Sequence, residues 1–425
     1  MNQVNRVSLV WALMWAVVVV LAGTVATVMA DGYRNPPEGA AALGRGGARA
    51  VYADDGSAVT HNPAALTDLE QATLTLSTTL AYAPTDYTSP SGMSESSDAS
   101  VGVLPAVYAT MPLKDGRTVV GIGLNSPYGQ AMEWDENGLF KGLAPDFAEL
   151  KTANVNLVVG LKLCDRVSVG AGLNVLWGNI KFQQSLLPPP GVPAPSSRLT
   201  FDGDGYGLGG NFGLVWNLTD SQRIALSYRM PVSVTAEGDF TMGNPPPPGA
   251  LPPTVTPMSS FETELNFPAV AVIGYGIQVC DKLRLQTEVE WVEHSQNDVL
   301  KIDIANNNAL LVAVLGTTEL PQDWDDTWTV AVGADWTCNE SWVLRSGYTW
   351  LPTPVPDATF LPVLTEGDKH VLGIGAGYRN GADSVDVAYA YSIAEDRDIA
   401  PGSSLVAGTY ETDPHLCTVT YTHRF

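Results

Sequence analysis

Apolar and polar residues alternate along most of the chain. From about residue 71 to residue 425, apolar side chains recur at every second position in runs rich in Val, Leu, Gly, Thr, Tyr and Trp. In residues 327–337, small or polar residues separate the apolar positions Trp328, Val330, Val332, Ala334 and Trp336. A period of two is the period of a β-strand, whose successive side chains point to opposite faces. The pattern therefore predicts an all-β fold for residues 71–425.

The connections between the predicted strands alternate between short and long. Six are tight turns, at residues 114–116, 164–166, 219–221, 280–282, 338–340 and 380–383. Seven are long loops, at residues 84–100, 128–150, 186–202, 242–260, 303–326, 352–368 and 395–410. These connections delimit fourteen strands. Short turns on one rim, long loops on the other and an even number of strands indicate a 14-stranded antiparallel transmembrane β-barrel of the outer-membrane type.

The composition agrees with a barrel in lipid. Hydrophobic residues make up 45% of the 425 residues and charged residues only 16%, against about 25% charged residues in an average soluble domain. A lipid-facing apolar band explains this deficit, because it replaces the charged surface of a soluble protein. The 45 acidic residues outnumber the 22 Lys and Arg residues. This balance argues against nucleic-acid binding, which needs clustered cations.

The first 70 residues lack the strand pattern. Residues 1–30 combine one charged side chain, Arg6, with an apolar stretch that ends at Val28-Met29-Ala30. This is typical of a secretory signal peptide, and an uncleaved membrane anchor is the alternative. Residues 31–70 are rich in Gly and Ala. We interpret them as a separate element that either plugs the barrel or hangs in the periplasm.

The chain ends on an aromatic residue. Tyr421 and Phe425 lie on the apolar face of the last predicted strand, and this ending looks like the C-terminal signal of barrels that are assembled into outer membranes. The predicted location is the outer membrane of a Gram-negative-type envelope, reached with the help of the barrel assembly machinery. The expected surroundings are outer-membrane lipids and lipopolysaccharide.

Several segments resemble one family of outer-membrane proteins. Residues 42–66 contain Asn62-Pro63-Ala64 and resemble the N-terminal hatch of the FadL/TodX family of outer-membrane long-chain fatty acid and hydrocarbon transporters. The resemblance continues, in the family's order, through residues 121–129, 167–174, 325–333, 342–348 and 353–357. It implies a barrel plugged by residues 31–70, an apolar pocket for a fatty acid or hydrocarbon, and release sideways through the wall. It implies no cofactor and no energy source.

The resemblance also points to a kink in the third strand. The family's lateral exit lies at a kinked strand, and the matching positions here are Gly121, Gly123, Asn125 and Ser126. Gly and Pro weaken strand ladders, and Pro127 follows directly. The sequence departs from the family's commoner pattern at Ser126-Pro127-Tyr128, where Asn-Pro-Phe or Thr-Pro-Phe is more usual. Glycines that only provide room inside the barrel are the alternative.

The third and fourth long loops are rich in proline and apolar residues. They contain the substrate-binding candidates Leu186, Leu187, Leu251 and Met258. A stiff apolar loop loses little entropy when an oily ligand docks, so these loops are candidates for a funnel that captures the substrate. A rigid loop that only packs on its neighbour is an equal alternative.

A fatty acid carries one carboxylate, which a cation inside the barrel would bind strongly. The period of two places four cations on the polar faces of their strands, namely Lys162, Arg229, Arg284 and Arg345. We expect Arg345 to pair with Asp335 on the neighbouring strand. Arg284 is expected to pair with Glu288 on its own strand. Lys162 and Arg229 have no obvious acid nearby in the sequence, so they are the candidates for binding the carboxylate.

The sequence offers no catalytic or metal site. Four cysteines, Cys164, Cys280, Cys338 and Cys417, form no CxxC pair, and their disulfide connectivity stays open. His294 and Ser295 are expected to point to opposite faces of a strand, which separates a base from a nucleophile. Acidic residues in the loops are expected to form a solvated face. We therefore expect no enzyme, no metal and no cofactor.

Two other functions stay open on the sequence. A general polar-solute porin needs an unplugged lumen, whereas a surface-binding protein or adhesin needs only the long loops. The expected function is passive transport of long-chain fatty acids or other hydrophobic compounds across the outer membrane.

Overall fold

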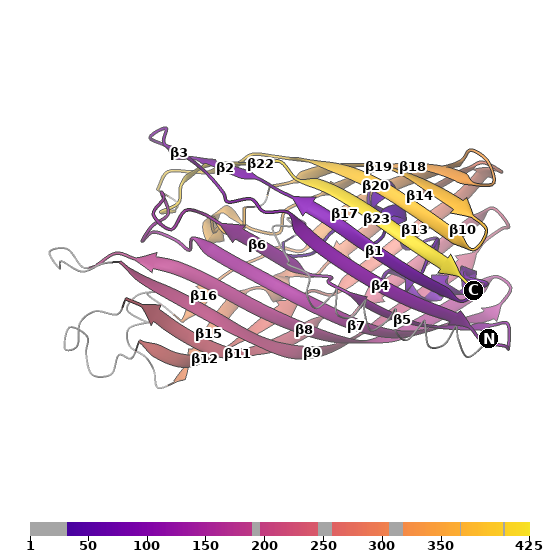
Figure 1. The fold of residues 1–425 in the computed structure, drawn as a ribbon, viewed down its shortest axis with the longest axis horizontal. Helices are drawn as coiled ribbons and strands as arrows, with labels where there is room; N and C mark the ends of the chain where they lie inside the picture. Colours follow the sequence, from indigo (N-terminus) through magenta and orange to yellow (C-terminus); the bar gives the residue numbers. More distant parts are fainter. Residues whose placement is uncertain (1–31, 189–195, 245–256, 306–317, 366, 403) are drawn as a thin grey trace.

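The computed structural model describes residues 32–188, 196–244, 257–305, 318–365, 367–402 and 404–425. Their main sheet is antiparallel and closes into a barrel where β1 (Thr73–Tyr82) pairs with β23 (His415–Arg424) (Figure 1). Nineteen segments make up this sheet, and five barrel strands consist of two segments each, so the barrel has fourteen strands. The predicted fold class is confirmed.

Nine barrel strands are continuous: β1, β4 (Gly102–Pro112), β7 (Phe147–Cys164), β8 (Val167–Leu186), β9 (Ser197–Asn217), β18 (Trp342–Leu351), β19 (Lys369–Asn380), β20 (Asp383–Ala394) and β23. The other five are β5 (Thr118–Asn125) with β6 (Gly129–Glu133), β10 (Gln222–Arg229) with β11 (Val232–Gly243), β12 (Met258–Phe267) with β13 (Val270–Cys280), β14 (Leu283–Val292) with β15 (Val299–Ile304), and β16 (Glu319–Pro321) with β17 (Thr327–Thr337).

The two ends of the barrel differ. The short turns and the C-terminus lie at one end, which we call the turn end, and the long connections extend from the opposite loop end (Figure 1). At the loop end a second, four-stranded sheet is made of β2 (Thr85–Thr88), β3 (Ser94–Ser96), β21 (Arg397–Ile399) and β22 (Gly408–Thr412). The sequence predicts loops there, because strands of three to five residues are too short to display a clear period of two.

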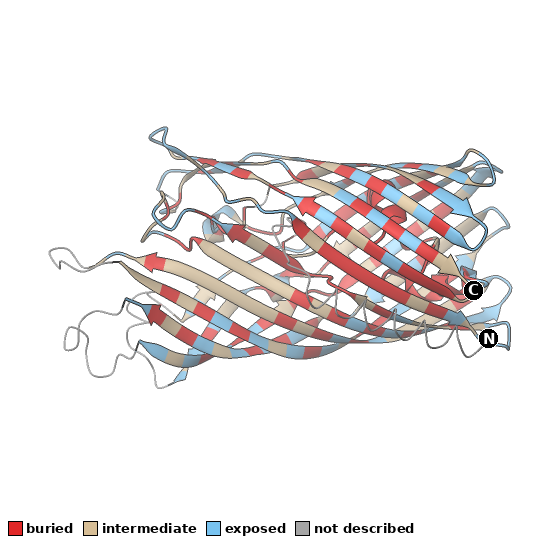
Figure 2. Ribbon diagram, viewed as in Figure 1, coloured by how far each residue is buried: buried red, intermediate tan, exposed pale blue. Residues whose placement is uncertain are grey.

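The alternating side chains face two different environments (Figure 2). The predicted strand at residues 327–337 is β17, in which Trp328 and Trp336 are 58% and 47% exposed on the outer face and Thr329 is buried inside. The two tryptophans are eight residues apart on a tilted strand. That spacing suits the apolar band of an outer-membrane barrel, which is about 25 Å tall and bordered by aromatic residues.

The N-terminal residues 32–70 fold inside the barrel. They form α2 (Ala40–Gly44), α3 (Ala58–His61) and the 3-10 helix η1 (Pro63–Asp68), and most of their side chains are buried. Wall glycines make this packing possible. A Cβ atom on Gly347 would overlap the backbone of Arg45, and one on Gly170 would overlap the backbone of Pro63. The inward glycines therefore provide room for residues 32–70.

A buried network of charges joins residues 32–70 to the wall. Arg45 binds Asp54 at 2.5 Å and Asp335 at 3.3 Å. Arg345 pairs with Asp335 at 3.2 Å, as predicted. Arg284 binds Asp335 at 2.6 Å and Asp54 at 2.8 Å, so its predicted pairing with Glu288 is wrong. Burial raises the pKa of Asp54, but the surrounding arginines outweigh burial and hold this pKa well below its usual range.

Apolar side chains fill the loop end. Tyr87, Phe140, Phe360 and Tyr410 belong to one buried cluster, with the Tyr87 and Tyr410 ring centroids 4.7 Å apart. The cluster lies near the short 3-10 helix η4 (Asp357–Thr359). In the parts of the chain that the structure describes, every helix is too short or too polar to cross a membrane.

Candidate functional site

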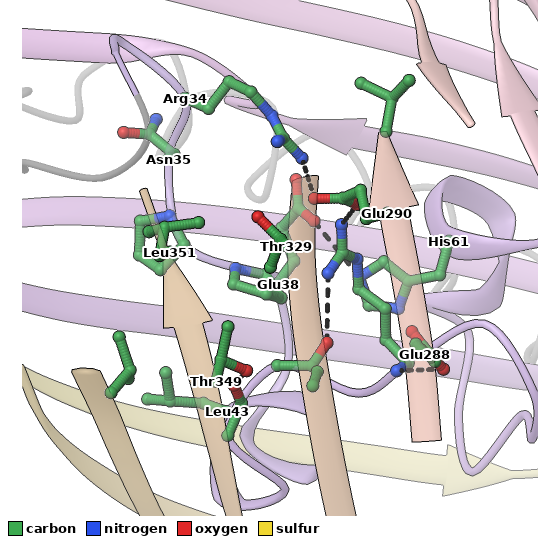
Figure 3. Close-up of a pocket in the computed structure, with 18 of the residues that line it drawn as sticks. Arg34, Asn35, Glu38, Leu43, His61, Glu288, Glu290, Thr329, Thr349 and Leu351 are labelled. Atoms are coloured by element: carbon green, nitrogen blue, oxygen red, sulfur yellow. Dashed lines mark hydrogen bonds and ion pairs between the residues drawn. The ribbon is translucent and has the colours of Figure 1, made fainter. Parts of the chain in front are cut away.

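A cavity of about 130 Å³ lies inside the barrel, between the wall and residues 32–70 (Figure 3). Both contribute to its lining. The wall residues include Pro127, Tyr128, Ser227, Arg229, Val270, Val272, Glu288 and Glu290, and the N-terminal residues include Arg34, Asn35, Glu38, Leu43, Arg49 and His61. The cavity is therefore built from segments that are far apart in the sequence.

One side of the cavity is charged. Arg34 binds Glu290 at 3.0 Å and Arg49 binds the same carboxylate at 2.5 Å. Glu288 accepts hydrogen bonds from the backbone N–H groups of Arg49, at 2.8 Å, and Ala50, at 2.6 Å. Figure 3 shows Glu290 beside Arg34 within the cavity. These glutamates are thus held by residues 32–70.

Arg229 contributes a further cation to the lining. Its Nη2 atom donates to the carbonyl oxygen of Thr60 at 3.2 Å. Glu38 lies in the same region, where its carboxylate contacts Nε2 of His61 at 3.3 Å and accepts a hydrogen bond from Asn125. Burial raises the pKa of Glu38, but the hydrogen bond and charge of His61, together with the charge of Arg229, outweigh burial and lower this pKa to about 2.

The remaining lining is partly polar, with Ser227, Thr329, Thr349, Lys369 and Ser392, and partly apolar. The apolar part includes Leu43, Val270, Val272, Ala331, Leu351, Val371 and Leu416. An alkyl chain is stabilised against such a surface by about 0.8 kcal/mol for each CH₂ group that it buries. The cavity therefore offers a cation and an apolar wall side by side, which is the chemistry that an amphipathic acid needs.

The third barrel strand is interrupted next to this cavity. β5 pairs with β4 up to Leu124↔Val107, whereas β6 pairs with β7 only. Within the described chain, residues 102–106 of β4 consequently have a ladder partner on the β1 side alone. Figure 1 draws β6 as a short separate strand between β4 and β7. The wall is thus incomplete where Pro127 and Tyr128 line the cavity.

The N-terminal segment lies against this interruption. The N–H of Asn35 donates to the carbonyl of Pro127 at 3.0 Å, and its side chain donates to the carbonyl of Ser126 at 2.8 Å. Asn125 and Ser126 are buried at the end of β5. The structure therefore brings these two predicted exit residues together beside the cavity.

The two predicted exit glycines lie within the paired part of β5, before the interruption. Gly121 and Gly123 lie within β5, which pairs with both β4 and β7 along this stretch. A Cβ atom on Gly123 would lie 2.8 Å from the ring of Tyr108 and 3.0 Å from Val59, and one on Gly121 would lie 2.7 Å from Val59. These glycines make room for Val59, and the interruption follows Asn125.

Asn62-Pro63-Ala64 lies deep in the N-terminal element. The Asn62 side chain donates to the carbonyl of Ala50 at 2.8 Å and accepts from the N–H of Ala64 at 3.1 Å, which caps η1. A Cβ atom on Gly213 of β9 would overlap the Asn62 side chain. The motif therefore fixes the fold of this element and its seat on the wall.

The other predicted binding residues lie away from the cavity. Lys162 is exposed near the turn end of β7. Leu186 packs against the apolar cluster around Phe201, and Leu187 lies over Gly142. Met258 is 63% exposed at the start of β12. Leu251 lies outside the described residues.

His294 and Ser295 do not lie on a strand, which corrects the sequence-based prediction. They form the 3-10 helix η2 (His294–Gln296) between β14 and β15. His294 is buried against Trp324, with ring centroids 5.8 Å apart, whereas Ser295 is exposed and its N–H donates to Asp326. Among the described residues, no group of three His, Cys, Asp or Glu side chains could hold a metal ion.

Sequence reasoning missed the charged residues that residues 32–70 bring into the cavity. Arg34, Glu38 and Arg49 lie in a segment without strand periodicity, so no parity rule assigns them to an inner face. Glu290 lies on the polar face of β14, so the period of two places it inside the barrel, as it does the four cations. Its partners, however, come from the N-terminal element and are invisible in the strand pattern.

A closed 14-stranded barrel with aromatic residues at the borders of its lipid-facing surface is an outer-membrane protein. The family model described as "Outer membrane protein transport protein (OMPP1/FadL/TodX)" matches residues 21–425. The chain belongs to this FadL/TodX family of outer-membrane transporters of hydrophobic compounds, and its place is the outer membrane. The family consists of transport channels rather than enzymes.

Curated relatives cover most of the chain. A putative outer membrane protein of Neisseria meningitidis is 25% identical over an alignment of 418 positions that covers 88% of this chain and 89% of the relative. The long-chain fatty acid transport protein of Escherichia coli K12 is 25% identical over an alignment of 392 positions that covers 83% of this chain and 85% of the relative.

Solved structures show the same fold. A FadL homologue of Pseudomonas aeruginosa superposes with a TM-score of 0.79 at 22% identity and covers 93% of this chain and 100% of its own. The toluene transporter TodX of Pseudomonas putida superposes with a TM-score of 0.72 at 17% identity, covering 93% and 99%.

Proposed function

We propose that the protein carries long-chain fatty acids, or hydrophobic compounds of similar shape, passively into the cell. In this proposal the outer loops capture the substrate, the cavity holds it, and the wall releases it sideways into the membrane. The observation that carries the proposal is the position of the cavity, which combines Arg229, an apolar wall and the interrupted third strand.

The lining favours an amphipathic acid over a plain hydrocarbon. Arg34 and Arg49 both bind Glu290, whereas Arg229 donates to the carbonyl of Thr60. A carboxylate next to Arg229 would replace a neutral acceptor by a charged one, and charge-assisted hydrogen bonds are roughly twice as strong. The alkyl chain would lie along Val270, Val272 and the other apolar lining residues.

The interruption between β4 and β6 supports lateral release. Separating two paired strands in lipid leaves N–H and C=O groups unpaired, at several kcal/mol each. Residues 102–106 of β4 have no ladder pair with the described β6, so that cost is already absent there. Asn125 and Ser126 border the passage, and Gly121 and Gly123 let Val59 approach the wall beside it.

The remaining assignments follow the same proposal. Residues 1–30 would be removed as a signal peptide, and residues 31–70 would act as the hatch that closes the lumen to polar solutes. The apolar loop residues Leu186, Leu187 and Met258 would contribute to capture at the loop end. Assembly would involve the barrel assembly machinery, in a membrane whose outer leaflet contains lipopolysaccharide.

Binding measurements with matched ligands test the role of Arg229. We expect Arg229→Ala to weaken palmitate binding about tenfold or more, the effect of losing one charge-assisted bond, and to leave methyl palmitate unaffected. Lys162→Ala is the matched control, because this exposed cation lies near the turn end. We expect this variant to bind palmitate and methyl palmitate as tightly as the wild-type protein does. Equal losses for the acid and the ester would contradict recognition of the carboxylate.

A further inference from the structure

The barrel wall contains a second interruption, on the far side of β8 and β9 from the first. β10 pairs with β9 up to Arg229↔Asn211, and β11 resumes the pairing at Glu237↔Asp204. Among the described residues no ladder pair joins residues 205–209 of β9 to residues 231–236. Pro231 lies in this stretch and cannot donate a ladder hydrogen bond.

At this interruption β11 leaves the plane of the wall. It stays paired with β12, from Val232↔Phe267 onward. A Cβ atom on Gly207 of β9 would lie 2.5 Å from the carbonyl oxygen of Ser233, and one on Gly205 would overlap the carbonyl of Thr235. These odd-numbered glycines face the lumen, as Asn211 does. The start of β11 therefore folds inward over β9.

Because β11 folds inward here, the side chains on the outer face of β9 are highly exposed. Tyr206 and Leu208 are 70% and 78% exposed and point to the lipid side. Trp216 lies ten residues from Tyr206 on the same face of the strand. Aromatic residues at this spacing mark the two borders of the apolar band, so Leu208 lies within the membrane, close to its outer border.

One row of ladder pairs connects the two interruptions. Gly129 of β6 pairs with Lys151, Lys151 with Asn179, and Asn179 with Asp204 of β9. The pairing of β6 begins at one end of this row, and the pairing of β11 with β9 ends at the other. A ribbon of β6, β7, β8 and β9 is thus flanked by an interruption on each side.

Both interruptions border the same cavity. Pro127 and Tyr128 line it at the first, and Arg229 lines it directly before the second. On the lipid side, a groove of about 490 Å³ begins beside the second interruption and is lined mainly by apolar residues, including Phe212, Leu226, Tyr228, Ile273, Trp291 and Trp328. Ser227 and Val272 line both the cavity and the groove. One strand thickness therefore separates the inner cavity from a membrane-facing groove.

A small apolar cluster seals the passage in this structure. Val232 and Val234 of β11 are buried with Tyr128 and Phe267, whose ring centroids are 4.6 Å apart. Tyr33, at the start of the described chain, packs on the same rings. The seal thus joins side chains from both interruptions.

We propose that the interruption between β9 and β11 is a second lateral opening, through which the alkyl chain of the substrate passes between the cavity and the groove lined by Phe212 and Trp328. Because the described residues form no ladder pair across it, separating the strands there breaks no ladder hydrogen bond in lipid. What has to rearrange is the packing of Val232 and Val234 against Tyr128 and Phe267 and the inward fold of β11 over Gly205 and Gly207. This inference rests on the proposed function, since it needs a hydrophobic substrate in the cavity.

Photo-crosslinking from the lipid face tests the proposal. The photoreactive residue benzoylphenylalanine would replace Leu208 at the second opening, Ile122 beside the first, or Ile374 on β19. Ile374 is a matched control, because it is 61% exposed on the lipid side and its strand pairs with β18 and β20. Each variant would first be shown to fold by its heat-modifiable migration on gels. Radiolabelled palmitate would then be supplied to cells that express it.

We expect labelling at Leu208 at least fivefold above that at Ile374, and competition by unlabelled palmitate. Labelling at Leu208 equal to that at Ile374, with competable labelling at Ile122, would overturn the second opening and leave the proposed function intact. No competable labelling at either opening, together with no palmitate uptake by the wild-type protein, would overturn the proposed function and this inference with it.

Discussion

The wall of the barrel contains two contrasting regions. Along β17, β18 and β19 the ladder is regular, from Val330↔Trp350 to Thr337↔Val343 and from Trp342↔Tyr378 to Leu351↔Lys369. Around β5–β6 and β10–β11 the ladder is interrupted at the level of the cavity. Both regions line the cavity, but the regular region also carries the buried charges that hold residues 32–70, whereas the interrupted region places gaps in the ladder beside the cavity.

The difference shows how one sheet can both anchor residues 32–70 and release a substrate. Regular pairing lets Gly347 and Gly373 bring the wall against the backbone of residues 43–46 and places Asp335 beside three arginines. Interrupted pairing removes the hydrogen bonds that keep neighbouring strands together in lipid. Changes in the first region should therefore loosen the hatch, and changes in the second should alter the route of the substrate.

The largest effect is expected from Asp335→Asn. Asp335 contacts Arg45, Arg284 and Arg345 at 3.3, 2.6 and 3.2 Å, and its side chain is 5% exposed. Removing one partner of a buried ion pair typically costs 3–5 kcal/mol, because the other charges stay buried. We expect a loss of about this size in the free energy of unfolding in detergent, and larger ion conductance in planar bilayers as the hatch loosens.

Asp383→Asn is the matched control for that measurement. Asp383 lies at the same turn end, pairs with His423 at 2.8 Å and has a side chain that is 52% exposed. Exposed pairs contribute little to stability, because solvent and salt screen them. If the two variants lost the same stability and conducted equally, the buried network would not anchor residues 32–70.

A smaller effect is expected from Gly347→Ala. The new Cβ atom would overlap the backbone of Arg45, which cannot move aside as a flexible side chain could. Overpacking of this kind costs roughly 1–3 kcal/mol. Protease digestion of folded protein should cut residues 32–70 faster in this variant. Gly178→Ala is the control, because its Cβ would lie 3.7 Å from Phe267, an ordinary contact, and unchanged digestion of Gly347→Ala would refute the close fit.

The fold was predictable because a barrel repeats one pattern. Alternation in β17 and the contrast between short turns and long connections identify strands, their inner faces and their number. The same parity correctly paired Arg345 with Asp335, which lie opposite each other in neighbouring strands. For Arg284 the predicted partner on its own strand was wrong, because Arg284 binds Asp335, which lies opposite it on β17, and Asp54, which comes from residues without periodicity.

The cavity could be predicted only in part, because it forms where the pattern stops. Parity assigned Arg229 to the lumen, and the cavity lining includes it. Lys162 has the same parity but lies near the turn end, and parity says nothing about height along the barrel. The inward fold of β11 has a faint sequence signal in Pro231 and in the alternate glycines of residues 203–209. The direction in which β11 folds depends on its pairing with β12, and no local pattern in the sequence of β11 identifies that pairing.

The smallest effect concerns the contact between the interrupted region and residues 32–70 at Glu38, whose carboxylate contacts Asn125 at the end of β5 and His61 in α3. Its pKa is about 2 in the folded protein against an ordinary value of 4.5. A carboxyl with a depressed pKa stabilises the fold above its unfolded pKa, and this contribution is lost as the pH falls from about 4.5 toward 2.

We therefore expect the wild-type protein to lose roughly 1 kcal/mol through Glu38 between pH 7 and pH 4. Glu38→Gln should lack this loss, because glutamine keeps the shape but does not titrate. The comparison is the difference in free energy of unfolding between the two proteins, measured in detergent at each pH, which cancels the titration of carboxyls elsewhere. A difference that stays constant from pH 7 to pH 3 would mean that Glu38 has the same pKa folded and unfolded. In that case neither His61 nor Arg229 would stabilise the charged form of Glu38 in the folded protein.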